Sequence, residues 1–70
     1  MQKLTLAIDG MTCNHCQMTV TRALLGVEGV ERAEVSLEEA RAEVEFDPQR
    51  ARVEDLVRAV DEEGYGAHAL

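Results

Sequence analysis

Hydrophobic residues alternate with polar or smaller ones in four short segments of this 70-residue chain. The segments are residues 4–8, 33–37, 42–46 and 67–69. A period of two residues predicts half-buried β-strands. The second and third segments are joined by the short turn Glu38-Glu39-Ala40, so we expect them to pair as a hairpin with one charged face.

Two further segments have the period of a helix. Between about Asn14 and Leu25, the residues Cys16, Val20 and Leu24 fall on one face together with Ala23 and Val27. A second and clearer pattern places Val53, Leu56, Val57 and Val60 on one face, with charged residues on the other. The sequence therefore predicts two amphipathic helices between the strands.

Polar residues and glycines suggest where these helices begin and end. Thr12 is a candidate cap for the first helix, and Gly26 follows its last turn. Arg52 occupies the position where a capping Ser or Thr would be expected before the second helix, so that boundary is loosely defined. Gly64 is expected just beyond the end of the second helix, in the left-handed conformation.

The predicted order of elements is β-α-β-β-α-β. This order is typical of a ferredoxin-like α+β sandwich, in which two helices cover one face of a four-stranded antiparallel sheet. No linker or low-complexity stretch divides the chain, so we expect a single domain over residues 1–70.

The composition excludes several classes of function. The net charge of −7 makes nucleic acid and anionic membranes poor partners, because both would repel the protein. No apolar run approaches the ~20 residues of a membrane span, and residues 1–4 do not resemble the start of a signal peptide. We therefore expect a cytoplasmic protein. Two cysteines do not make the disulfide framework that is typical of small secreted proteins.

The two cysteines, Cys13 and Cys16, are the strongest chemical signal in the chain. Both lie at the predicted start of the first helix, where the helix dipole lowers thiol pKa values. Two thiolates without a carboxylate ligand favour a soft ion, above all Cu(I), whereas a closed zinc site normally needs four ligands. Gln17 follows Cys16, which excludes the CxxCH pattern of haem attachment.

Two alternatives to a metal site remain at this point. A CxxC before a helix is also found in thioredoxin-like oxidoreductases, but the aromatic and proline residues typical of that motif are missing here. The two cysteines could also be small buried hydrophobic residues. An exposed loop before a helix makes burial the weaker explanation.

The segment GMTCNHC, residues 10–16, resembles the GMTCxxC signature of the heavy-metal-associated domain family. The resemblance continues through Gly29-Val30, Asp47-Pro48 and Gly64-Tyr65, and so covers essentially the whole chain. The family includes bacterial copper chaperones and the N-terminal domains of copper-transporting P-type ATPases. The resemblance implies that Cys13 and Cys16 bind Cu(I) and pass it on by thiolate exchange.

We therefore expect a cytoplasmic copper chaperone, not an enzyme, whose partner is the metal-binding domain of a copper-transporting P-type ATPase. The apo protein is expected to be monomeric, with a copper-bridged dimer as an alternative. Other candidates are an excised ATPase domain, although Met1 and the end after the last strand favour a free protein, and a thiol redox protein. Zn(II), Cd(II), Ag(I) or Hg(II) could bind in vitro, but Thr12 stands where an acidic residue would have favoured a divalent ion.

Four residues are expected to support the site. Met11 is either a thioether ligand or, as the resemblance favours, a core residue that anchors the loop. Thr12 is expected to be a loop or capping residue. His15 should be exposed, where it is either a surface residue, a group that tunes the thiolates or a third ligand in a dimer. Tyr65 should lie at the same end of the sheet and shield the site, or merely close the edge of the core. His68 is expected to face solvent.

Overall fold

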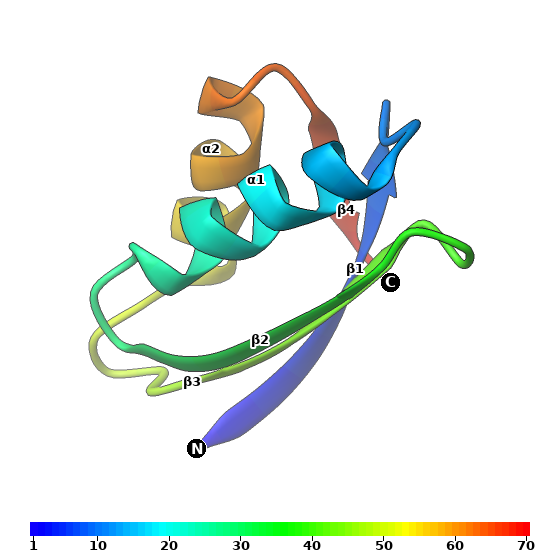
Figure 1. Cartoon of the computed structure of the whole chain (residues 1–70). Helices are drawn as coiled ribbons and strands as arrows, with labels where there is room; N and C mark the ends of the chain where they lie inside the picture. The colour runs from blue at the N-terminus through cyan, green and yellow to red at the C-terminus, as the bar shows by residue number, and fades with distance from the viewer.

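The computed structural model describes all 70 residues and confirms the predicted fold (Figure 1). The strands and helices are β1 (Gln2–Asp9), α1 (Asn14–Leu25), β2 (Val30–Ser36), β3 (Arg41–Phe46), α2 (Val53–Glu62) and β4 (Gly66–Ala69). The four strands form one antiparallel sheet in the order β2-β3-β1-β4, and both helices cover the same face. This arrangement is the ferredoxin-like sandwich that the order of elements predicts.

The predicted alternation is confirmed by burial in β1 and β3, whereas in β4 Ala67 is half-buried but Ala69 is exposed like His68. In β1, Leu6 and Ile8 are buried while the residues between and beside them are more exposed. In β3, Ala42, Val44 and Phe46 are buried. The core also includes residues from both helices and from the loop before α2: Val20, Leu24, Ala51, Leu56 and Val60. It is aliphatic apart from one phenylalanine, and its burial supplies the main force that folds the chain.

Strand β1 begins two residues before the predicted segment. Gln2 and Lys3 have little hydrophobic signal of their own, but they pair with Phe46 and Glu45 of β3. The partner strand therefore extends β1 beyond the alternating pattern. In the hairpin of β2 and β3, the predicted strand residue Leu37 lies outside β2 and begins the turn to β3.

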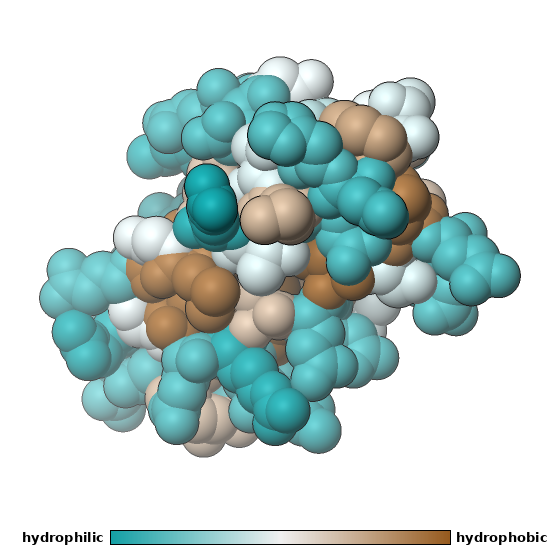
Figure 2. Space-filling view, viewed as in Figure 1, coloured by the Kyte–Doolittle hydropathy of each residue, from teal (hydrophilic) through white to brown (hydrophobic).

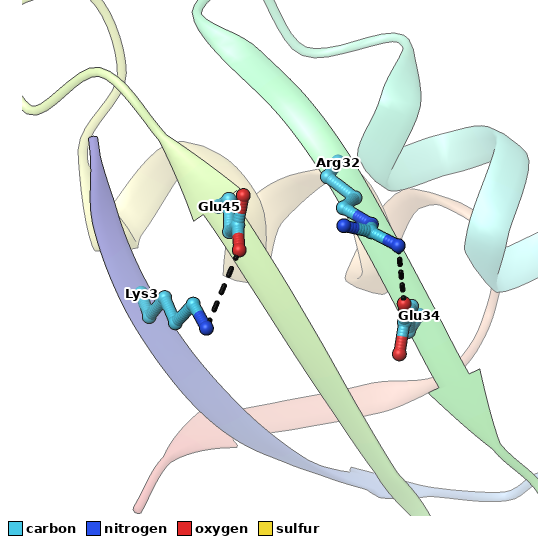
Figure 3. Close-up of polar contacts among 4 residues, drawn as sticks. All are labelled: Lys3, Arg32, Glu34 and Glu45. Atoms are coloured by element: carbon cyan, nitrogen blue, oxygen red, sulfur yellow. Dashed lines mark ion pairs between the residues drawn. The ribbon is translucent and has the colours of Figure 1, made fainter.

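The face of the sheet away from the helices carries charged side chains (Figure 3). Lys3 of β1 lies 3.5 Å from Glu45 of β3, and Arg32 lies 3.2 Å from Glu34 along β2. Both pairs are on the surface, where such contacts contribute little to stability. Glu34 and Glu43 are directly opposite each other, an unfavourable arrangement of like charges. The charged face of the hairpin is therefore confirmed, and it is solvated rather than strongly stabilising.

The surface is largely hydrophilic in the view of Figure 2, with smaller hydrophobic patches between the polar side chains. The large hydrophobic residues that remain exposed are Met1, Met18, Leu25 and Leu70. Neither helix has the length and apolar character that crossing a membrane requires.

Candidate metal-binding site

The loop that carries the cysteines begins where β1 ends. Gly10 has a φ of 97°, which residues with a side chain rarely adopt, and turns the chain away from the sheet. Cys13 is extended, with φ −156° and ψ 170°, and is the N-cap of α1. Of the two roles expected for Thr12, the structure shows the loop residue, because the cap lies one residue later. The side chain of Cys13 makes no capping hydrogen bond.

The sulfur atoms of Cys13 and Cys16 lie 3.6 Å apart. Cys13 is exposed and Cys16 is half-buried, and neither forms a disulfide. If metal–sulfur bonds are about 2.3 Å long, as for zinc, this separation corresponds to an S–metal–S angle of about 100°. A linear two-coordinate ion would require about 4.6 Å at the same bond length, so the exposed Cys13 side chain would have to swing outward by about 1 Å.

The thiol of Cys16 has a pKa lowered from 9.0 to about 6. The largest cause is the backbone amide of Thr12, followed by the hydroxyl of Tyr65 and the thiol of Cys13; partial burial opposes them. The Thr12 hydroxyl, 3.9 Å from the sulfur, contributes least. Cys16 is thus mainly a thiolate at neutral pH. The sequence predicted this direction from the helix dipole, but a loop amide in front of the helix is the leading cause.

Tyr65 is held beside the cysteines by the end of α2. Gly64 has a φ of 91°, its N–H donates to Asp61 O at 2.9 Å, and the N–H of Tyr65 donates to Val60 O at 3.3 Å. These two bonds form a Schellman motif, as the position of Gly64 predicts. The ring of Tyr65 lies against Gly10, where an added Cβ would come within 3.4 Å of it. The predicted location of Tyr65 at the metal-loop end is therefore correct.

Tyr65 and Cys16 shift each other's pKa values in opposite directions. The pKa of Tyr65 is raised, first because its hydroxyl donates a hydrogen bond to the Cys16 thiolate and then because of partial burial. The same interaction lowers the pKa of Cys16. Tyr65 is also half-buried and packs on the core, so the ring closes the edge of the core beside the two-cysteine loop.

The other candidate residues occupy different environments. Met11 is half-buried and packs against the core, which agrees with an anchoring role for this side chain. His15 and His68 are both exposed, as expected. Cys13 and Cys16 belong to no group of three or more His, Cys, Asp or Glu residues that could surround an ion.

One contact near the site was missed in the sequence. The side-chain oxygen of Gln17 accepts a hydrogen bond from the backbone N–H of Leu37, at 3.2 Å. The partners are twenty residues apart, and no periodicity or short motif relates them. The one available signal is that Gln17, a polar residue, stands next to Cys16 of the apolar face of α1, where its half-buried amide needs a hydrogen-bond partner.

Comparison with known proteins identifies the family. The heavy-metal-associated domain matches residues 5–66. The chain belongs to this family. Among its relatives, the mercuric transport protein periplasmic component of Shigella flexneri is 45% identical over 64 residues, which cover 91% of this chain and 70% of that protein. The copper-transporting ATPase RAN1 of Arabidopsis thaliana is 39% identical over all 70 residues, but these span only 7% of the ATPase.

Solved structures of heavy-metal-associated domains agree closely with this one. A copper-binding domain from HMA7, a P-type ATPase, has a TM-score of 0.98 and 38% identity, covering 100% of this chain and 95% of that chain. The CopZ metallochaperone has a TM-score of 0.92 and 31% identity, covering 96% of this chain and 100% of that chain. The relatives and solved structures therefore include a metallochaperone, segments of copper ATPases and a mercuric transport protein.

Proposed function

We propose that this heavy-metal-associated domain is a copper chaperone that binds Cu(I) between Cys13 and Cys16. The observation that carries the proposal is the pair of sulfurs 3.6 Å apart at an exposed helix start, one of them with a pKa of about 6. A soft donor set of two thiolates suits Cu(I), which accepts low coordination numbers. The likeness to CopZ and to the HMA7 domain supports the choice of ion.

In the proposed mechanism, the ion passes to a partner without leaving sulfur. A thiolate from a partner CxxC donates an electron pair to Cu(I) and forms a three-coordinate intermediate shared by both proteins. One of the two original Cys–Cu bonds then breaks, and that sulfur retains its electron pair as a free thiolate or takes up a proton. The exposure of Cys13 supports such an approach, since the partner can reach the ion from the solvent side.

The partner in this proposal is the metal-binding domain of a copper-transporting P-type ATPase. It is supported by the similarity of this chain to a segment of RAN1. The same similarity is compatible with a second arrangement, in which this sequence is itself an ATPase domain. The full reading frame around the sequence distinguishes the two arrangements, because an ATPase would continue into transmembrane segments. In either case the chain acts as a binding protein rather than an enzyme.

A second candidate function is the binding of Hg(II). The observation that favours it is the 45% identity to a mercuric transport protein. That relative is a periplasmic component, whereas the copper proposal assigns this chain to the cytoplasm, where thiols are kept reduced. Resistance of cells to Hg(II) and to copper, with and without the gene, would show which ion the protein serves.

The site is tested by competition titrations with Cu(I), Zn(II) and Hg(II) on the native chain and on Cys13→Ser and Cys16→Ser. The proposal predicts that each substitution weakens Cu(I) binding strongly and that Zn(II) binds the native chain far more weakly than Cu(I). Equal Cu(I) affinity in all three proteins would reject the assignment of the ligands. His15→Ala provides a further comparison, because unchanged copper affinity and dimerisation would assign His15 to the solvated surface.

A further inference from the structure

The first turn of α1 receives little support from its own sequence. Its N-cap residue is Cys13, which makes no side-chain cap, and the turn contains no Asp or Glu. A helix start without a capping side chain is less stable by about 1 kcal/mol than one with a Ser or Asp cap. The sulfurs of the site therefore sit on a helix end that should fray unless contacts from elsewhere hold it.

Such contacts come from the turn between β2 and β3, residues Leu37–Ala40, which we call the hairpin turn. The N–H of Leu37 donates to the Gln17 side chain at 3.2 Å, directly after the second cysteine. The carbonyl of Ala40 accepts from the N–H of Ile8 at 2.8 Å, two residues before Gly10. The hairpin turn thus holds the chain on both sides of the two-cysteine loop.

The hairpin turn is itself well ordered by hydrogen bonds. The N–H of Ala40 donates to Leu37 O at 3.3 Å, and the N–H of Glu39 donates to the hydroxyl of Ser36 at 3.2 Å. Ala40 has a φ of 55°, a left-handed conformation that is uncommon for a residue other than glycine. A turn fixed in this way can serve as a support for the less stable helix end.

Gln17 connects this support to the cysteines. Its backbone N–H donates to Cys13 O at 3.2 Å and closes the first turn of α1, while its side chain accepts from Leu37. We propose that the hairpin turn is a brace for the first turn of α1 and that Gln17 is the positioning residue through which it acts. The consequence for metal binding rests on the proposed function, whereas the brace itself can be tested without metal.

The brace is tested by amide hydrogen exchange of the apo protein, followed by NMR. Gln17→Leu removes the acceptor, and exchange at Gln17 and Leu37 should become about five-fold faster relative to the core amide of Val60, the effect of losing one net hydrogen bond. Gln17→Glu keeps an acceptor oxygen and should restore protection at Leu37. Thr21→Val is the matched control, because it removes a half-buried hydrogen bond from Thr21 to Gln17 O without affecting the hairpin turn.

Uniform acceleration of all amides in Gln17→Leu, or equal effects of Gln17→Leu and Thr21→Val, would overturn the brace. If Gln17→Leu fails to fold, loss of Leu37 protection in Gln17→Glu would overturn the brace, and retention of that protection would support it.

In the loaded protein, we expect Gln17→Leu to release Cu(I) to a chelator several-fold faster than Thr21→Val. Equal release rates would overturn the link to the metal, while Cu(I) binding unaffected by Cys13→Ser and Cys16→Ser would reject the proposed function instead.

Discussion

Cys16 should react as a thiolate far below the pH at which an ordinary cysteine does, and Tyr65→Phe should weaken this behaviour. At pH 5, a pKa of about 6 in place of 9.0 raises the thiolate fraction roughly 900-fold. A thiolate of lower pKa is also less nucleophilic, and a pKa lower by about three reduces its intrinsic reactivity about 20-fold. The net advantage is therefore about 40-fold at pH 5 but only about 5-fold at pH 7, so acidic pH is the sensitive condition.

The assay is the rate of reaction of the apo protein with an aromatic disulfide reagent between pH 4 and pH 10, and Cys16→Ser identifies the fast phase by removing it. The native profile should have its midpoint near pH 6. In Tyr65→Phe the midpoint should move upward, because the second-largest cause of the lowered pKa is lost. A midpoint near pH 9 in the native protein, or a fast phase that persists in Cys16→Ser, would refute the reasoning.

The same pKa sets the sign of a stability effect. Because folding lowers the pKa of Cys16 from 9.0 to about 6, the thiolate contributes in full to stability above pH 9. The contribution decreases below pH 9 and is lost as the pH falls through 6. Urea unfolding should therefore show a larger loss of stability between pH 8 and pH 5 in the native chain than in Cys16→Ser.

Three further predictions concern the scaffold. Leu24 is fully buried, whereas Leu25 is 48% exposed. Leu24→Ala should therefore lower the unfolding free energy by about 2–5 kcal/mol, the typical range for core truncations, and Leu25→Ala by about 0.5 kcal/mol or less. Equal losses in urea titrations would contradict the assigned core. Ala40→Asn should raise the unfolding free energy by about 0.5 kcal/mol, since asparagine tolerates the left-handed conformation better, and a decrease would oppose this view of the turn. The aliphatic core should fold without metal, so far-UV circular dichroism should be the same with and without Cu(I).

Much of the fold could be predicted because each element carries its own hydrophobic period. The bounds of α1 agree with the prediction, and Val53 begins α2 as its pattern indicates. The start of α2 was uncertain because Arg52 is a poor cap. The structure shows that the carboxylate of Asp55 accepts from the N–H of Arg52 at 3.0 Å, so the helix end is supported from within its own first turn.

The cysteines and Tyr65 could be predicted from the motif and the topology, because both loops lie at the same end of the sheet. The features that could not be predicted depend on the path of loops and on tertiary packing. The role of the Thr12 amide depends on the path of a loop, and the bond from Leu37 to Gln17 depends on how the hairpin packs against α1. The left-handed φ of Ala40 has no signal in its residue type. Local patterns thus specify the scaffold, whereas the details of the site arise from tertiary packing.

X-ray absorption spectroscopy of the Cu(I)-loaded protein shows which atoms surround the ion, and so tests the proposal that two thiolates hold it. The first shell of the ion should contain only sulfur, from Cys13 and Cys16, in a low coordination number. A first shell of nitrogen and oxygen without sulfur would contradict it.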